Sequence, residues 1–505
     1  MTHPALTLPE LLENIFENAD RPSNASNVLV CKQWSLICLP VLWYEISGIA
    51  DFVRLARLLG PMSAVDSDES EDEDHPFQYV SYPGAQDWAR FERYAILVRE
   101  IRLKDLHHGC KQIFATMAEG RRNLNMFPNL HTLEYDMFDS IISPCLLFMH
   151  SPVTRIKLVL PREHGFKPHL DSELSSVIEA IPKIGHLQSL EINGSFIILS
   201  RDLDRRLGAI KRLQKVQKIT LPQYALRTNV FEALAYLPEL RELKTQYSTT
   251  LHTYNPVDPL PVLPPGSFST LSCLTLSTDI EKTVQFLNEY TLVSRLNELN
   301  IELEDFDSTS LPPLLIAVGK VCRRLRRLSI RKRLLPRDYV EPYPQINILA
   351  LAPITSFADL THLELRHPSC LPAITEADLE DFIAQIPHVQ SLSLEAGTFH
   401  TEKNLTLHAL VIIATQCLYL TDLELILNAV DIHTLPLDPP VFRSLQRLKP
   451  LESSIKDVHG VAFFLAQVFP RGCVLDAAEG MWGTVANWIP QLVRMRLLTE
   501  QRFRG

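Results

Sequence analysis

A short hydrophobic motif, L-x-x-L-x-L with Ile or Val allowed, recurs along most of this 505-residue chain and limits what it can fold into. Thirteen copies give a mean spacing of about 29 residues, which is typical of stacked repeats and not of one compact core. The end of each copy alternates apolar and polar residues, as a half-buried strand does. We therefore expect one short strand per repeat. The copies end at Leu103, Tyr135, Leu158, Ile192, Leu221, Thr245, Leu276, Ile301, Ile330, Leu365, Leu394, Leu425 and, weakly, Pro450.

This pattern resembles the leucine-rich repeat, whose period runs from about 20 to 29 residues with longer variants. The resemblance implies an α/β fold: a curved solenoid with parallel strands on its concave face and helices on its convex face. Helices are expected between strands, for example at residues 308–321, 379–386 and 407–418. Proline-rich excursions at 255–266 and 335–344 are expected to be loops on one rim, either contact loops or tolerated insertions.

The first fifty residues follow a different, helical pattern. Thr7 and Glu10 fit a capping box at a helix start, and Pro9 suits the first turn. Pro22 is expected to end this helix, and Pro40 to end a second one. About 40 residues bury too little apolar surface to offset their ordering entropy, so we expect this segment to need a partner or the following domain. The first helix repeats apolar residues at Leu8, Leu11, Leu12, Ile15 and Phe16.

Residues 6–47 resemble the F-box in the order and spacing of three segments: Leu8-Pro9-x-x-Leu12-x-x-Ile15-Phe16, Val30-Cys31-Lys32-x-Trp34 and Leu42-Trp43. Asn27 departs from the family, which is usually more apolar there. Members bind a Skp-type adaptor, which links them to a cullin and a RING subunit for ubiquitin transfer. The alternative is an ordinary helical hairpin with both tryptophans in its core. The resemblance implies that the adaptor is bound by Leu8, Pro9, Leu12, Ile15, Phe16, Leu29, Val30, Cys31, Trp34, Leu42 and Trp43.

The pattern predicts four parts along the chain. They are an F-box at 1–50, a helix with an acidic linker at 51–86, the solenoid at 87–476 and a C-terminal cap at 477–505. A helix is expected to begin at Asp87 as its cap, and its segment resembles one that follows the F-box in a large group of fungal F-box proteins. The cap is expected because an open repeat array needs its last core face covered.

The linker contains an acidic block, residues 66–74, in which seven of nine residues are Asp or Glu. Such a block repels itself and cannot bury a core, so we expect it to be disordered. One interpretation is a solvated loop. The other is that Ser70, with Glu73 three residues on, accepts phosphate from an acidophilic kinase.

Composition excludes several classes of partner and compartment. A net charge of −10 argues against nucleic-acid binding. Nine cysteines without a C-x-x-C pair indicate reduced thiols, as in the cytoplasm or nucleus. Apolar runs are too short to span a membrane, so no membrane partner is expected.

Catalytic and metal-binding patterns are also missing from the sequence. The motifs of nucleotide-binding, hydrolase and zinc-protease sites do not occur, so we expect no enzyme activity and no cofactor or metal. His107 and His108 are adjacent and give no ready metal-binding face. Cys417 ends an Ile-Ala-containing helix, as in the cysteine-containing repeats of F-box proteins, where the resemblance implies a small buried residue. A catalytic thiol is the rival interpretation.

Four basic residues are expected to meet on the concave face, because neighbouring strands lie about 5 Å apart. One interpretation is a site for an acidic or phosphorylated client, bound through arginine forks. The other is a surface whose charges pair with one another. These residues are Arg327, Arg331, His362 and Arg366.

Taken with the F-box resemblance, these patterns favour the substrate receptor of a Skp–cullin–F-box type ubiquitin ligase, with a protein client that the sequence does not identify. Two other classes stay open: an adaptor or scaffold outside ubiquitylation, and a sensor with a small ligand in the solenoid bowl.

Overall fold

The computed structural model groups the chain into two compact units, residues 1–251 with 267–270 and residues 252–266 with 271–505. Each is described by itself. The boundaries predicted between the four parts of the chain, at residues 50, 86 and 476, remain predictions. The described residues are 8–64, 77–104, 108–137, 142–150, 152–160, 168–194, 208–222, 228–246, 263–264, 266–289, 294–303, 306–332, 346–367, 374–396, 405–430, 432, 435–436, 438–451, 453–477 and 480–504.

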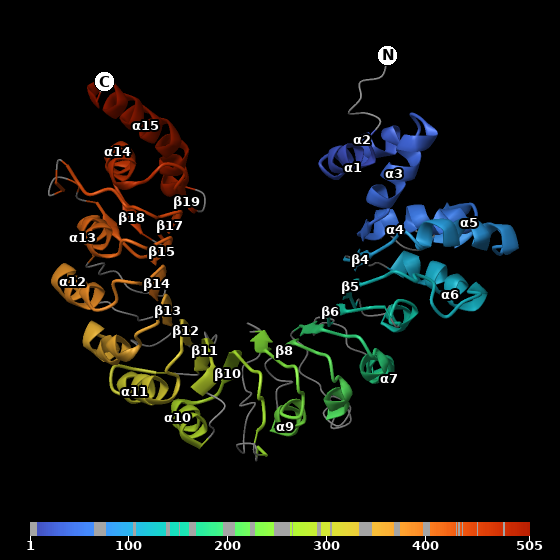
Figure 1. Ribbon diagram of the computed structural model, residues 1–505, viewed down its shortest axis with the longest axis horizontal. Helices are drawn as coiled ribbons and strands as arrows, with labels where there is room; N and C mark the ends of the chain where they lie inside the picture. The colour runs from blue at the N-terminus through green and yellow to red at the C-terminus, as the bar shows by residue number, and fades with distance from the viewer. Residues whose placement is uncertain are drawn as a thin grey trace. The chain divides into compact units, whose positions relative to one another are not determined.

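In unit 1, parallel strands form a β-ladder along one side, and the helices that connect them lie along the other side (Figure 1). A short antiparallel pair, β2 (Met62–Ala64) and β3 (Phe77–Tyr79), lies outside this ladder. The ladder strands are β1 (Glu45–Ser47), β4 (Glu100–Leu103), β5 (Thr132–Asp136), β6 (Arg155–Val159), β7 (Ser189–Asn193), β8 (Lys218–Pro222) and β9 (Glu242–Gln246). The helices are α1 (Pro9–Glu17), α2 (Arg21–Asn27), α3 (Lys32–Leu42), α4 (Ile49–Ala56), α5 (Ala85–Ala95), α6 (Lys111–Gly120), α7 (Pro168–Ala180) and α9 (Thr228–Leu234).

Unit 2 repeats this arrangement and adds a short parallel side ladder, β16 (Asn428–Ala429) with β18 (Ser454–Ile455). Its main strands are β10 (Cys273–Ser277), β11 (Glu298–Leu303), β12 (Arg327–Lys332), β13 (His362–His367), β14 (Ser391–Ala396), β15 (Asp422–Leu425), β17 (Arg447–Lys449) and β19 (Val474–Leu475). Its helices are α10 (Ile280–Glu289), α11 (Leu311–Val321), α12 (Glu376–Ala384), α13 (His408–Gln416), α14 (Val458–Val468) and α15 (Met481–Arg504), with a 3₁₀ segment at Ile348–Ser356.

The predicted strands form because each motif places its apolar side chains on one side. In β5 the burial alternates, with Leu133 and Tyr135 buried, and Leu130 is buried in the turn before the strand. The weak copies ending at Thr245 and Pro450 also form strands, β9 and β17. Each of the thirteen motif copies therefore forms a parallel strand, and the leucine-rich-repeat solenoid is confirmed.

A recurring backbone hydrogen-bond pattern explains the two polar positions of L-x-x-L. The N–H groups of His131 and Thr132 both donate to the carbonyl of Arg99, at 2.8 and 3.2 Å. In unit 2 those of Thr361 and His362 both donate to the carbonyl of Arg326, at 2.9 Å. These positions therefore need a backbone N–H, and the same bond pair joins repeat to repeat along each unit.

The N-terminal helices differ from the prediction at their ends. Thr7 lies outside the described residues, and α1 begins after Leu8 without a side-chain cap. Pro22 does not end α1 but lies in the first turn of α2, where Asp20 caps the helix by accepting from the Ser23 N–H at 2.8 Å. Pro40 does not break α3, since it lies in the last turn and removes only one backbone donor there.

Two strands of the main parallel ladders were missed because they lack the full motif. β1 pairs in parallel with β4, aligning Ile46 with Ile101, and so joins the N-terminal helices to the solenoid. β19 pairs with β17 near the C-terminal end of unit 2.

The predicted helix cap at Asp87 is also wrong. The helix α5 begins after Gly84, and Asp87 lies inside its first turn, where its carboxylate accepts from the Gly84 N–H at 2.9 Å.

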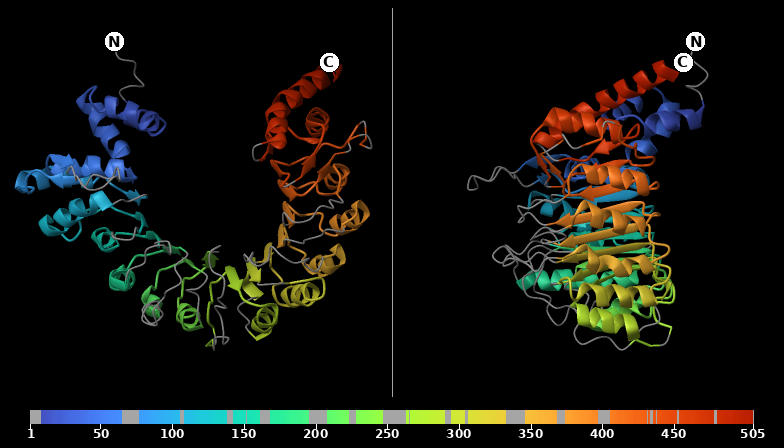
Figure 2. Two further views of the ribbon diagram at one scale, coloured as in Figure 1. Left: turned by 180° about the vertical axis from the view of Figure 1, so that it is seen from behind. Right: turned by 90° about the vertical axis from the view of Figure 1, so that its left-hand side faces the viewer.

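The expected helices between repeats are confirmed by α11, α12 and α13. The C-terminal segment forms α15, which packs along α14 (Figure 2). Arg496 of α15 fixes this packing by donating to the carbonyls of Ala466 and Phe469, at 2.7 and 2.9 Å. Those carbonyls belong to the end of α14, where backbone acceptors have no helical partner.

Candidate functional site

A small core holds the three N-terminal helices together. Leu12 and Phe16 of α1 pack with Cys38 of α3, and all three are fully buried. The ring of Trp34 meets that of Phe16 edge-on, with centroids 5.4 Å apart. Asn24 of α2 donates its side-chain N–H to the Phe16 carbonyl at 2.7 Å, which closes the end of α1.

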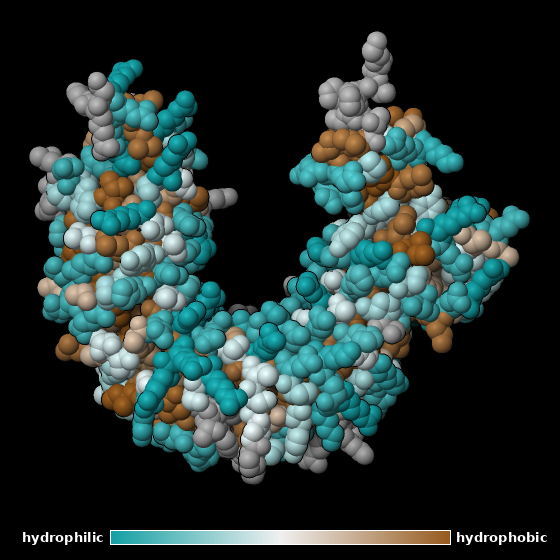
Figure 3. All heavy atoms as spheres, viewed as in Figure 1, coloured by the Kyte–Doolittle hydropathy of each residue, from teal (hydrophilic) through white to brown (hydrophobic). Residues whose placement is uncertain are grey.

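Beside the buried Leu12 and Phe16, α1 carries further apolar residues that this core does not cover. Leu8, Leu11 and Ile15 recur at helical spacing, and each is close to half exposed. A helix whose apolar surface is wider than its own core covers has part of that surface left for another protein. Figure 3 shows hydrophobic residues at the surface of the N-terminal helices.

The turn between α2 and α3 adds two more exposed apolar residues. Leu29 is 84% exposed and Val30 is 60% exposed. Exposed side chains of this size so close together mark interaction sites more often than isolated ones do. Cys31 follows, exposed, and its sulfur accepts from the Trp34 N–H at the start of α3.

Several contacts fix these three helices to the rest of unit 1. Arg21 forms an ion pair with Asp51 at 3.0 Å and donates to the Glu45 carbonyl at 3.2 Å. Trp43 packs edge-on against Tyr94 of α5, with ring centroids 5.6 Å apart. The helices that carry the exposed apolar residues are therefore held in place by the neighbouring elements of unit 1.

The structure divides the eleven predicted adaptor-binding residues into two groups. Two further exposed residues were not among the eleven, namely Leu36 on α3 and Leu11 on α1. The helical spacing of Leu8, Leu11 and Ile15 is the sequence signal that identifies Leu11. Accessible members are Leu8, Pro9, Ile15, Leu29, Val30 and Cys31, whereas Leu12 and Phe16 are buried and Trp34, Leu42 and Trp43 are half-buried.

The four predicted basic residues do lie on neighbouring strands, β12 and β13. Arg327 aligns with His362, and Arg331 with Arg366. Carboxylates interrupt the patch, however. Arg331 lies 2.7 Å from Glu364, Arg366 lies 3.5 Å from the same side chain, and Arg327 lies 4.0 Å from Glu298.

The titration of this patch follows from those contacts. Burial raises the pKa of Glu364, but the hydrogen bond and charge of Arg331 outweigh it, with Ser329 and Arg366, and the pKa falls below its usual value. Burial, and then the charge of Arg327, lower the pKa of His362. Arg331 and Arg366 thus face an ionised carboxylate at Glu364, and the neutral form of His362 is favoured.

The two helix-ending cysteines share one geometry. Cys322 ends α11 and Cys417 ends α13, and each donates its N–H to the carbonyl four residues back, at 2.7 and 2.8 Å. Burial raises the pKa of both thiols to about 12. A thiolate nucleophile needs a lowered pKa, so this environment opposes the catalytic interpretation.

Other predicted positions carry no site in the part of the chain described. Ser70 and His107 lie outside the described residues. Within those residues, no group of three or more His, Cys, Asp or Glu side chains is placed to hold a metal ion. None of the described helices combines the length and apolar character that crossing a bilayer requires.

Comparisons with known proteins returned only distant structural likenesses. Neither a scan against protein-family models nor a search of the curated proteins found a match. Similar solved structures include a TLR13–ssRNA13 complex, at 12% identity and TM-score 0.35 over 77% of this chain and 60% of that one. A mouse RP105/MD-1 complex has 15% identity and TM-score 0.34, over 77% and 65%.

A yeast Rad7–Elc1 complex has 16% identity and TM-score 0.37, over 74% of this chain and 88% of that one. This chain spans less than two thirds of the matched chain in the first two structures. Likenesses with TM-scores of this size support no conclusion about what this chain binds.

Proposed function

We propose that this chain is a non-catalytic substrate receptor of a Skp–cullin–F-box type ubiquitin ligase. The observation that carries the proposal is the apolar surface of α1 and the α2–α3 turn that the helices' own core leaves exposed. That face coincides with the segment whose motifs resemble the F-box. An adaptor that covers it removes Leu8, Leu11, Ile15, Leu29 and Val30 from water.

The proposed mechanism is proximity. The N-terminal helices fix the chain to the adaptor, and through it to the cullin, RING subunit and charged ubiquitin carrier. The repeats hold the client, so that transfer becomes effectively intramolecular. No cofactor and no membrane are required, and the proposed compartment is the cytoplasm or nucleus.

Co-purification from cells tests the ligase assembly. Leu29→Asp with Val30→Asp is the informative variant, because both residues are exposed and outside the core. Leu12→Ala or Trp34→Ala would disturb the core and confuse misfolding with lost binding. We expect the wild type to recover a Skp-type adaptor and a cullin, and the variant to lose both.

The result also separates the alternatives. Recovery of the adaptor without any cullin would favour a scaffold outside ubiquitylation. Failure of the folded wild type to recover an adaptor would reject the proposal.

For the client, we propose the concave surface around Arg331 and Arg366 as the contact region. Arg331 and Arg366 both contact the carboxylate of Glu364, and an acidic or phosphorylated segment would compete with that carboxylate for their guanidiniums. Proximity labelling under proteasome inhibition compares wild type with an Arg327→Ala, Arg331→Ala, Arg366→Ala triple variant. Proteins labelled by both to the same extent would remove this patch from the proposal.

A further inference from the structure

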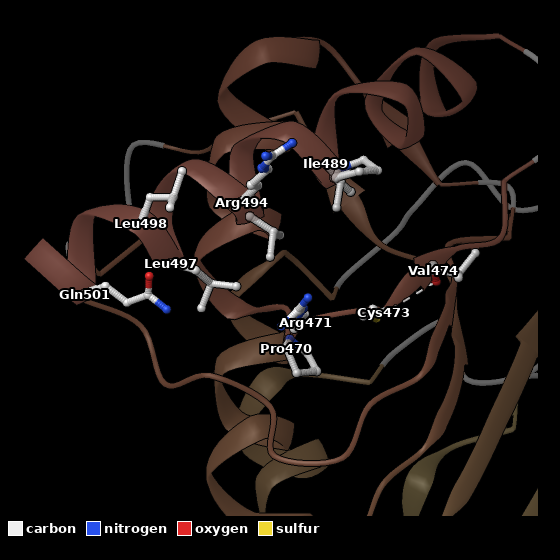
Figure 4. A pocket seen from close by; sticks show the side chains of 12 residues that line it. Pro470, Arg471, Cys473, Val474, Ile489, Arg494, Leu497, Leu498 and Gln501 are labelled. Atoms are coloured by element: carbon white, nitrogen blue, oxygen red, sulfur yellow. Dashed lines mark hydrogen bonds between the residues drawn. The ribbon is translucent and has the colours of Figure 1, made fainter.

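The C-terminal end of unit 2 contains a groove of about 690 Å³ that the adaptor-docking proposal does not use. One wall is α15, and the other is the segment from Pro470 to Val474 between α14 and β19 (Figure 4). The chain turns there at Gly472, whose φ of +85° lies in the left-handed region that glycine favours.

The groove has an apolar floor and an apolar rim. Ile489 and Val493 of α15 are buried at its base. Val474 and Leu498 lie on the rim, 59% and 50% exposed, and Leu497 lies beside them. Water therefore contacts aliphatic side chains from two elements that are within reach of one ligand.

Two arginines flank this apolar surface from opposite walls. Arg471 comes from the turn and Arg494 from α15 (Figure 4), and both are exposed. Within the described residues neither guanidinium has an ion-pair partner, unlike Arg331 and Arg366 on the concave face.

The groove is held rigid by bonds outside it. Arg496, one turn from the groove floor, donates to the carbonyls that end α14. Trp482, at the start of α15, donates its indole N–H to the Ser453 carbonyl at 2.8 Å. A preformed groove costs less ordering entropy on binding than a flexible one.

We propose that this groove binds an acidic peptide segment of a partner protein, with aliphatic or aromatic side chains in the groove and carboxylates on Arg471 and Arg494. Guanidiniums pair with carboxylates in a forked geometry, which gives the charge preference. A lipid surface fits less well, because the apolar residues line a hollow and two arginines are fewer than the four to eight basic residues typical of anionic-lipid recognition. The proposal rests on unit 2 alone and does not depend on the F-box.

A charge-swap selection tests the peptide chemistry. The probe is a phage-displayed library of short random peptides, selected against the full chain and against Arg471→Glu with Arg494→Glu. We expect the wild type to enrich peptides that combine Asp or Glu with Leu, Ile, Phe or Trp. The double variant should enrich Lys or Arg with the same apolar residues.

Binding of a synthetic selected peptide, measured by fluorescence anisotropy, then locates the site. Val474→Glu places a carboxylate on the groove rim and should weaken binding at least about tenfold. Met495→Glu is the matched control, since Met495 is an exposed apolar residue of α15 that does not line the groove. It should leave the affinity unchanged.

Three results would overturn the proposal: no enrichment, an enrichment that the charge swap leaves unaltered, or equal peptide binding by Val474→Glu and wild type. Phosphatidylserine vesicles provide the remaining arm. Vesicle binding that the double variant loses, without peptide enrichment, would assign the groove to a membrane surface instead.

Discussion

At the scale of single residues, neighbours in sequence have opposite roles in α1. Leu11 is 45% exposed and Leu12 is fully buried, although both are leucines in one helical turn. Sequence periodicity places both on one broad apolar surface of α1, but it cannot say which part of that surface meets the core. Packing against Cys38 and Trp34 decides it.

Leu12→Ala is expected to destabilise the N-terminal helices by about 2–5 kcal/mol, because it leaves a cavity in a small core. Leu11→Ala is the matched control and should stay within about 0.5 kcal/mol. Hydrogen exchange of the α1 and α3 amides measures the local opening free energy. Equal protection in the two variants would contradict the assignment of the core.

Asp307 caps the turn before α11, and its charge gives a pH signature. Hydrogen bonds from the Thr309 hydroxyl and the Ser310 N–H lower its pKa to about 2. The folded state thus favours the carboxylate, so the stabilisation is complete above the usual pKa near 4 and is lost as pH falls toward 2.

We therefore expect Asp307→Ala to cost about 0.5–2 kcal/mol at pH 7. The difference from wild type should shrink between pH 4 and pH 2, as followed by hydrogen exchange of the α11 amides. Asp307→Asn keeps a capping oxygen without the charge and should cost less at pH 7. A penalty for Asp307→Ala that does not change with pH would contradict the role of the charge.

At the scale of elements, the turns that lead from α11 and α13 to the next strand are built alike. Cys322 and Cys417 occupy the same position in this turn, at the ends of α11 and α13. Both are buried, whereas Cys31 at the start of α3 is exposed.

Alkylation of the native protein by iodoacetamide should therefore modify Cys31 first, because Cys31 is exposed, and leave Cys322 and Cys417 protected, because burial excludes the reagent and raises the pKa of both thiols. Peptide mass spectrometry over a time course reports the order. Urea-unfolded protein is the control and should lose the protection. Early modification of native Cys417 would revive the catalytic interpretation.

Most of the repeat elements could be predicted because one motif specifies both the strand and its burial. The short β1 and β19 could not, since two or three residues without L-x-x-L-x-L give too little pattern. Pro22 and Pro40 misled because a proline also fits the first turn of the next helix or the last turn of the present one.

For the candidate sites, sequence reasoning found the segments and not the exposed residues. It placed Arg331 and Arg366 side by side correctly, because strand register follows from the motif. It could not show that Arg331 and Arg366 both contact Glu364, nor that Arg471 and Arg494 flank one groove, since those depend on side-chain packing.

At the scale of the whole molecule, the surfaces divide between the two units. Unit 1 carries the exposed apolar face of α1 and the α2–α3 turn, and unit 2 carries the arginines of β12 and β13 and the C-terminal groove. A receptor needs such a division, because it binds its ligase and its client with different surfaces. The proposed receptor function depends on the first surface in particular.

Isothermal titration calorimetry of the purified full chain with a purified Skp-type adaptor tests that dependence most directly. Wild type and Ile316→Asp, an exposed apolar position on α11, should bind with equal affinity. Leu11→Asp with Ile15→Asp should weaken binding at least about 100-fold, because it puts two charges into the buried centre of the interface. No binding by the wild type, or equal binding by the α1 variant, would contradict the account.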